Sequence, residues 1–209
     1  MEKIKRLRHI LSKEQIDGYI IPKNDEFFGE YVFADKDRLK YISKFSGSFG
    51  FALILGDKNY LFVDGRYTLQ AKKECAKYFK VITLPNKKIY NLLKKKKYTI
   101  GFDPKLFTQK MITTFFRNTF KFEPVNSNLI DEIWKRKIRR GHNKFYMLPK
   151  NSVGNHHSFK INKIVSAIKK NGADYLWVTA SENNAWLLNI RGKDSKYSPI
   201  PNSHSLIDN

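Results

Sequence analysis

The chain has 209 residues, of which 41% are hydrophobic and 14% aromatic, and it carries a formal net charge of +21. This composition can supply a packed core, which argues against global disorder, and its apolar runs are far shorter than the roughly 20 residues that span a bilayer. Cys75 is the sole cysteine, which excludes an internal disulfide and fits a reducing compartment. Because the N-terminus also lacks a signal-peptide pattern, we expect a cytoplasmic protein without a membrane partner.

The positive charge comes almost entirely from lysine, with 31 lysines against nine arginines. Arginine is the better residue for bidentate recognition of phosphates and bases. We therefore interpret the charge as a solvated lysine-rich surface and expect no specific nucleic-acid partner. Binding of nucleic acid through counterion release is the alternative, and it would weaken steeply with salt.

Helical and strand patterns alternate over the first 125 residues. The spacing of Ile4, Leu7 and Leu11 predicts an amphipathic helix over the first dozen residues. A further helix is expected over 66–78, a short one around 89–93, and one from Asp103-Pro104 through Phe115. The expected strands are 18–22, 51–55, 60–63, 81–84, 98–102 and 120–125, with a hairpin turn at 56–59. This alternation predicts an α/β domain over residues 1–125.

The remaining residues divide into a connection and a second domain. Residues 126–157 are basic and lack a clear apolar period, apart from one or two helical turns at 128–134, so we expect a linker. Residues 158–209 begin with an amphipathic helix that Gly172 ends, followed by a buried strand at 175–178.

An internal repeat relates the two domains. DGYIIP at 17–22 is similar to DYLWVT at 174–179, and each follows a helix. Residues 41–47 match residues 186–192 in the spacing of apolar residues and glycine. We therefore expect an incomplete second copy of the first fold over 158–209, with no counterpart of the later strands and with apolar strand edges exposed at 175–178 and 185–190.

Three segments carry a family resemblance. Residues 37–50 are similar to the RLxYISGFTGSAG stretch of Xaa-Pro aminopeptidases, and residues 64–71 to their DGRYxLQA segment. Residues 185–207 are similar to their AWLLNLRGxDIPYxPxPxxxxLI stretch. The chain is thus identified as a member of the aminopeptidase P group. The resemblance implies a creatinase-like N-terminal domain, a mixed sheet with flanking helices, followed by the truncated start of a second domain of that fold.

The resemblance also bears on activity. The family removes an N-terminal residue preceding proline by means of two divalent metals, typically manganese, held in a third domain. That domain is missing here, so we expect no catalytic residue, no metal and no cofactor in this chain, and no peptidase activity from it alone. The alternative is a non-catalytic binding subunit that forms a homodimer or pairs with a separately encoded catalytic chain.

A few residues are candidates for a site. The resemblance makes Arg66, Tyr67 and Arg191 candidates for a substrate entrance or a subunit interface. The structural alternative for Asp64 is that it accepts amides at the start of the following helix, and Arg191 could instead pair with Asp194.

Other polar residues have structural interpretations. We interpret His156 and His157 as a solvated pair whose rings point in different directions, not as metal ligands. Lys44 stands where the family has a glycine, so a positive φ there would strain it. Phe49 likewise replaces a small residue and would crowd the turn.

Overall fold

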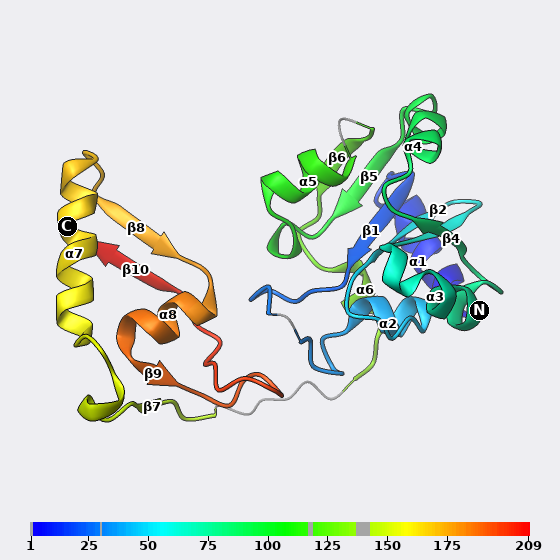
Figure 1. Cartoon of the computed structure of the whole chain (residues 1–209). Helices are drawn as coiled ribbons and strands as arrows, with labels where there is room; N and C mark the ends of the chain where they lie inside the picture. Colours follow the sequence, from blue (N-terminus) through cyan, green and yellow to red (C-terminus); the bar gives the residue numbers. More distant parts are fainter. Residues whose placement is uncertain (1, 30, 117–118, 137–142) are drawn as a thin grey trace. The chain divides into compact units, whose positions relative to one another are not determined.

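The computed structural model describes residues 2–29, 31–116, 119–136 and 143–209. The chain forms two compact units (Figure 1). Unit 1 comprises Met1–Glu26 and Ala34–Ile138, and unit 2 comprises Phe27–Phe33 and Arg139–Asn209. In the described part of the chain, no helix is long and apolar enough to cross a bilayer.

Unit 1 is built on a six-stranded sheet with the strand order β4-β3-β2-β1-β5-β6. The strands are β1 (Gly18–Pro22), β2 (Phe51–Leu55), β3 (Asn59–Val63), β4 (Lys80–Thr83), β5 (Thr99–Phe102) and β6 (Lys121–Pro124). Strand β2 runs antiparallel to β1 and β3, whereas the β3–β4, β1–β5 and β5–β6 pairs are parallel, so the sheet is mixed.

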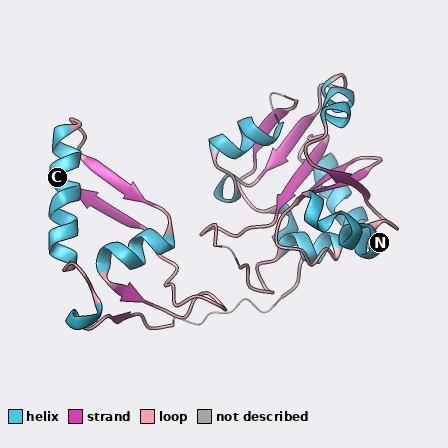
Figure 2. Ribbon diagram, viewed as in Figure 1, coloured by secondary structure: helices cyan, strands magenta, loops and turns pink. Residues whose placement is uncertain are grey.

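Helices cover both faces of this sheet (Figure 2). One face packs against α1 (Glu2–Lys13), α2 (Arg38–Ser43), α3 (Thr68–Cys75) and α6 (Leu129–Ile133). The other packs against α4 (Lys87–Lys94) and α5 (Gln109–Phe116). Side chains of a strand alternate between the two cores: Tyr19 and Ile21 face the first, and Ile20 faces the second. The predicted α/β fold with a mixed sheet and flanking helices is confirmed.

Unit 2 contains the second helix–strand sequence. Helix α7 (His157–Lys170) leads to β8 (Tyr175–Val178), then α8 (Ser181–Leu188), β9 (Ile190–Arg191) and β10 (Ser205–Asp208). Strand β10 pairs antiparallel with β8, and the short β7 (Tyr146–Met147) pairs antiparallel with β9. The 3₁₀ turns among the described residues are η1 (Gly65–Tyr67) and η2 (Pro104–Leu106) in unit 1 and η3 (Lys150–Ser152) in unit 2.

The internal repeat is visible in the backbone. Strand β1 faces β2 with Ile21 opposite Ala52, and β8 faces β10 with Val178 opposite Ser205, the equivalent position. Helices α2 and α8 both end at a residue in the left-handed conformation, Lys44 (φ 69°) and Asn189 (φ 55°), and these two residues are equivalent in the sequence repeat. Strand β10 is therefore a counterpart of β2 in the second copy, and the expectation that the later strands have no counterpart there was wrong.

Several local predictions were wrong. Strand β8 is not buried: Tyr175 and Trp177 are 63% and 56% exposed. Residues 185–190 do not form a strand edge, because most of them lie in α8. The helix expected from Asp103-Pro104 is a single 3₁₀ turn, with α5 starting only at Gln109.

The residues expected to form the linker contribute to both units. Helix α6 packs into the first core of unit 1, and β7 and η3 belong to unit 2. Part of the basic stretch, residues 137–142, lies outside the described residues.

Candidate functional site around the Asp64–Tyr67 turn

The turn after β3 is held by its own side chains. Asp64 accepts a hydrogen bond from the backbone N–H of Arg66 (2.9 Å) and an ion pair from the Arg66 guanidinium (2.7 Å). These bonds lower the pKa of the Asp64 carboxyl, with the Arg66 side chain as the main cause. The prediction that Asp64 accepts amides at the start of the next helix is confirmed, although that helix begins as η1. The Arg66 side chain is itself 74% exposed.

Tyr67 joins this turn to the glycine turn at 46–48. Its hydroxyl lies 2.6 Å from Ser48 Oγ, and its ring packs edge-on against the buried Phe45. Gly47 lies between these rings, since a Cβ there would approach Phe45 to 2.3 Å and Tyr67 to 2.8 Å. A side chain at position 47 would therefore displace at least one of these two rings.

A carboxylate of α3 holds the same glycine turn from the other side. Glu74 accepts hydrogen bonds from the Ser46 backbone N–H (2.8 Å) and from the Ser46 hydroxyl (2.6 Å). Gln70 donates to both Ser46 Oγ and Glu74. The two turns are thus tied together by polar contacts at the surface, and Arg66 remains the group most available to another molecule.

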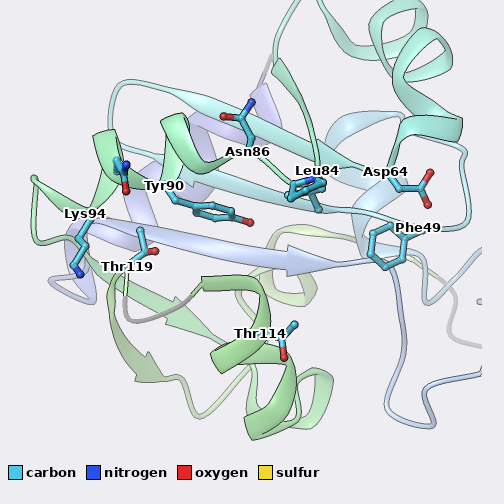
Figure 3. A pocket seen from close by; sticks show the side chains of 10 residues that line it. Phe49, Asp64, Leu84, Asn86, Tyr90, Lys94, Thr114 and Thr119 are labelled. Carbon is cyan, nitrogen blue, oxygen red and sulfur yellow. The ribbon is translucent and has the colours of Figure 1, made fainter.

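A cavity of about 630 Å³ adjoins the turn. Figure 3 shows Asp64 and Phe49 near one end and Lys94 near the other, with Tyr90 of α4 between them. Its lining residues are Phe49, Asp64, Leu84, Pro85, Asn86, Tyr90, Asn91, Lys94, Thr114 and Thr119. Phe49 therefore forms part of a cavity wall, and the cavity has the size of a small-molecule site in which apolar side chains are combined with a few polar groups.

Arg191 belongs to unit 2, whereas Arg66 and Tyr67 belong to unit 1. Its Nη1 donates to the carbonyl oxygens of Ala185 (3.2 Å) and Ile190 (2.8 Å). Asp194 instead accepts from Asn143 and from the backbone of Asn202. In the described structure, Arg191 thus caps the end of α8 and does not form the suggested ion pair with Asp194.

The histidine pair also differs from expectation. The rings of His156 and His157 lie 4.0 Å apart, so they do not point in different directions, and His156 is the N-cap of α7. Across the described residues, no group of three or more histidine, cysteine, aspartate or glutamate side chains could hold a metal ion.

The sequence analysis did not predict one cluster of charged side chains, which is centred on Arg38. Arg38, whose side chain is 5% exposed, donates to Glu26 (2.7 Å) and to both oxygens of Asp131 (2.7 and 2.8 Å). Lys36 also pairs with Glu26, and Arg136 with Asp131. Burial alone would raise the pKa of Glu26, but its own backbone N–H, Arg38 and Lys36 lower it to about 2. The partners are up to 93 residues apart, so no local motif could have revealed the cluster.

Comparison with known proteins connects these features to a family. Residues 3–133 match the model of the Creatinase/Prolidase N-terminal domain, and residues 136–209 match a second model of the same description. Xaa-Pro aminopeptidase 1 of Dictyostelium discoideum is 31% identical over 99% of this chain and 36% of that protein. A probable Xaa-Pro aminopeptidase P of Laccaria bicolor is 31% identical over 95% of this chain and 33% of that protein.

A solved structure gives the same result. The X-prolyl aminopeptidase of Caenorhabditis elegans, described as a cytosolic enzyme with a di-nuclear active site, superposes with a TM-score of 0.87 at 26% identity. The match covers 99% of this chain and 37% of that protein, so the chain spans about a third of the length of its relatives. The chain belongs to the creatinase/prolidase N-terminal domain family, and the homologues that cover it are Xaa-Pro aminopeptidases.

Proposed function

We propose that this chain is the N-terminal part of a cytoplasmic Xaa-Pro aminopeptidase, an enzyme that removes an N-terminal residue preceding proline with a pair of divalent metals. Residues 1–209 supply the two N-terminal domains and do not hydrolyse peptides alone. The metals, typically manganese, are held by the remainder of the enzyme. In this proposal, the two N-terminal domains help to shape and cover the catalytic site, and the remainder of the enzyme performs the peptide hydrolysis.

The observation that carries this proposal is the match to the nematode enzyme, with a TM-score of 0.87 over 99% of this chain. That match includes the residues of both units and has 26% sequence identity. The two 31% identical relatives, both named as Xaa-Pro aminopeptidases, support the same activity.

Within this function, Arg66 and Tyr67 form the surface that meets either the incoming peptide or a second subunit. This proposal is supported by the contacts of the turn itself. Arg66 is exposed, Asp64 accepts a hydrogen bond from its backbone N–H, and the ring of the neighbouring Tyr67 packs beside Gly47. A rigid turn presents a guanidinium at little entropic cost, which suits recognition of a carboxylate. For Arg191 we likewise propose a contact at the substrate entrance or at a subunit interface, because its bonds to the Ala185 and Ile190 carbonyls use only Nη1 and leave the N–H groups on Nε and Nη2 for another molecule.

The first experiment is a denaturing gel of the source cells, probed with an antibody raised against residues 1–209. A band well above 24.6 kDa supports the proposed enzyme, and that product should release the first residue of an Xaa-Pro peptide when manganese is supplied. The isolated 209-residue chain should show no such release. Cleavage by the purified chain, abolished by a chelator, would refute the division of labour.

The second candidate function is a non-catalytic subunit that forms a homodimer or pairs with a separate catalytic chain. The observation that favours it is the exposed apolar face of the β8–β10 sheet, where Tyr175, Trp177 and Leu206 are 63%, 56% and 60% exposed. Trp177 and Leu206 are opposite each other in the ladder, so they share one face. A band at 24.6 kDa, together with co-purification of a chain carrying a metal-binding domain, would favour this candidate.

We further propose that neither function uses specific nucleic acid. Titration of the chain with two unrelated DNA duplexes in 50 mM and 200 mM salt tests this proposal. Equal affinities that both fall steeply with salt fit a solvated lysine surface, whereas a preference for one sequence would contradict it.

A further inference from the structure

A second, smaller cavity in unit 2 carries an unusual charge. It has a volume of about 200 Å³, and its lining includes Gly154, Asn155, Lys160, Trp186, Asn189 and Arg191. Two of these residues are cations, and none of the lining residues is a carboxylate. Among the described residues, no ion pair neutralises either Lys160 or Arg191.

Lys160 is the more constrained of the two cations. Although it lies on α7, it is only 6% exposed, and its ammonium donates to the carbonyl of Trp186 and to Asn189 Oδ1, the latter at 2.5 Å. Its Nζ also lies 4.4 Å from the centre of the Trp186 ring. Burial, and secondly the charge of Arg191, lower the pKa of Lys160, as expected for a cation whose charge is incompletely compensated.

Capping of the C-terminal end of α8 accounts for part of this arrangement. Lys160 and Arg191 both donate to carbonyls of the last turn of α8, where cations offset the helix dipole. That dipole end is equivalent to only about half a negative charge, so it offsets a minor share of two positive charges. One proton of the Lys160 ammonium and three N–H groups on Nε and Nη2 of Arg191 have no role in this cap.

We propose that this cavity binds a small oxyanion, a carboxylate or a phosphate, between Lys160 and Arg191. An ammonium and a guanidinium that line the same cavity can form short charge-assisted hydrogen bonds with such a group. Asn189 is held in place by its own bond to the Asn155 carbonyl (3.0 Å) and orients the ammonium. The volume corresponds to about seven water molecules at liquid density, which is enough for one acetate or phosphate ion.

The test must separate this site from general anion binding, because a chain with a net charge of +21 attracts any anion. Inorganic phosphate and acetate are titrated separately into the full 209-residue chain at constant ionic strength, by calorimetry and by thermal unfolding. We expect saturable binding with one ion per chain. Saturation by phosphate alone would assign a phosphate site, and saturation by acetate assigns a carboxylate site.

The variants decide where the ion binds. Arg191→Gln should weaken the binding at least about tenfold, since it removes a charge-assisted hydrogen bond. The matched control is Lys163→Gln, which also removes one positive charge from unit 2. Lys163 lies on α7, where its side chain contacts Phe159 and does not line the cavity. Equal losses in the two variants, or no saturable binding by the unmodified chain, would overturn the proposal.

A second variant covers the case in which Arg191→Gln does not fold. A side chain at Gly154 has free space, because an added Cβ meets no atom within 4 Å. Gly154→Asp should place a carboxylate in the cavity, raise the unfolding temperature and abolish phosphate or acetate binding. Unchanged anion binding by this folded variant would equally refute the assignment.

Discussion

Lys44 holds a conformation that its side chain disfavours. As the residue that ends α2, it has φ 69° and ψ 1° and donates its backbone N–H to the Lys40 carbonyl at 2.8 Å. An L-residue with a Cβ loses about 1–2 kcal/mol in this left-handed region. Glycine removes that strain but gains freedom in the unfolded chain, which returns roughly 0.5–1 kcal/mol. Lys44→Gly should therefore stabilise unit 1 by about 1 kcal/mol.

The assay is urea unfolding followed by the fluorescence of Trp134, which stacks on Tyr41 with 4.4 Å between ring centres and so reports on unit 1. Trp177 and Trp186, both in unit 2 and both mostly exposed, are replaced by phenylalanine in every sample. In thermal unfolding the same gain corresponds to a rise in the midpoint of about 3–5 °C.

The matched control is Lys44→Ala, which removes the charge and the stem but keeps the Cβ. It also removes the repulsion by which Lys44, second to burial, lowers the pKa of Lys3. Because Lys44 is exposed, we expect Lys44→Ala to change the stability by less than about 0.5 kcal/mol. If alanine stabilised unit 1 as much as glycine, charge and not backbone strain would be the cause, and the reasoning would fail.

Three further outcomes follow from the structure. The pKa of Glu26 is lowered to about 2 in the folded chain, so its contribution to stability is present above the unfolded pKa of about 4.3 and disappears as the pH falls towards 2. In urea titrations at a series of pH values, Glu26→Gln should reduce the loss of unfolding free energy over this range, and an unchanged dependence of that free energy on pH would contradict the prediction. Cys75 is 1% exposed, and its pKa is raised to about 11, mainly by burial and secondly by Glu74. A thiol reagent at pH 8 should therefore modify Cys75 only after unfolding, whereas rapid reaction of the native chain would show that α3 opens. Trp177→Glu should reduce concentration-dependent self-association in sedimentation velocity, because Trp177 lies on the exposed face of the β8–β10 sheet. Trp186 is similarly exposed, so Trp186→Glu is the control, and equal effects of the two variants would show that the β8–β10 face is not the contact.

The sequence predicted the elements whose pattern is local. Strand β1 matches its predicted bounds, and β2 and β3 form their predicted hairpin, because both faces of these strands are covered and every position except Asn59 is apolar. Helix α1 was equally clear from its apolar spacing. The same logic failed for β8, whose apolar residues resemble those of β1. Periodicity reports the type of residue and not whether another layer covers the strand.

The polar parts of the candidate site were less accessible to prediction. The cap of Asp64 on the next turn could be predicted because its donor lies two residues away. The contacts of Glu74 with Ser46 and of Arg38 with Asp131 join residues 28 and 93 positions apart. Such pairs depend on how the helices pack on the sheet, so no spacing rule identifies them. The cavity beside Lys160 likewise forms from η3, α7 and the end of α8, which only the fold brings together.

The two copies satisfy the same backbone turn with different residues. Lys44 and Asn189 are equivalent, and both adopt the left-handed conformation that ends a helix. Asparagine tolerates this region better than lysine because its short amide bonds locally. Asn189 is also 6% exposed and binds Lys160 and Asn155, whereas Lys44 is exposed. The conformation therefore follows from the shared fold, while the residue follows from what surrounds it: in unit 1 the turn tolerates a strained lysine, and in unit 2 the same position has become part of a polar site.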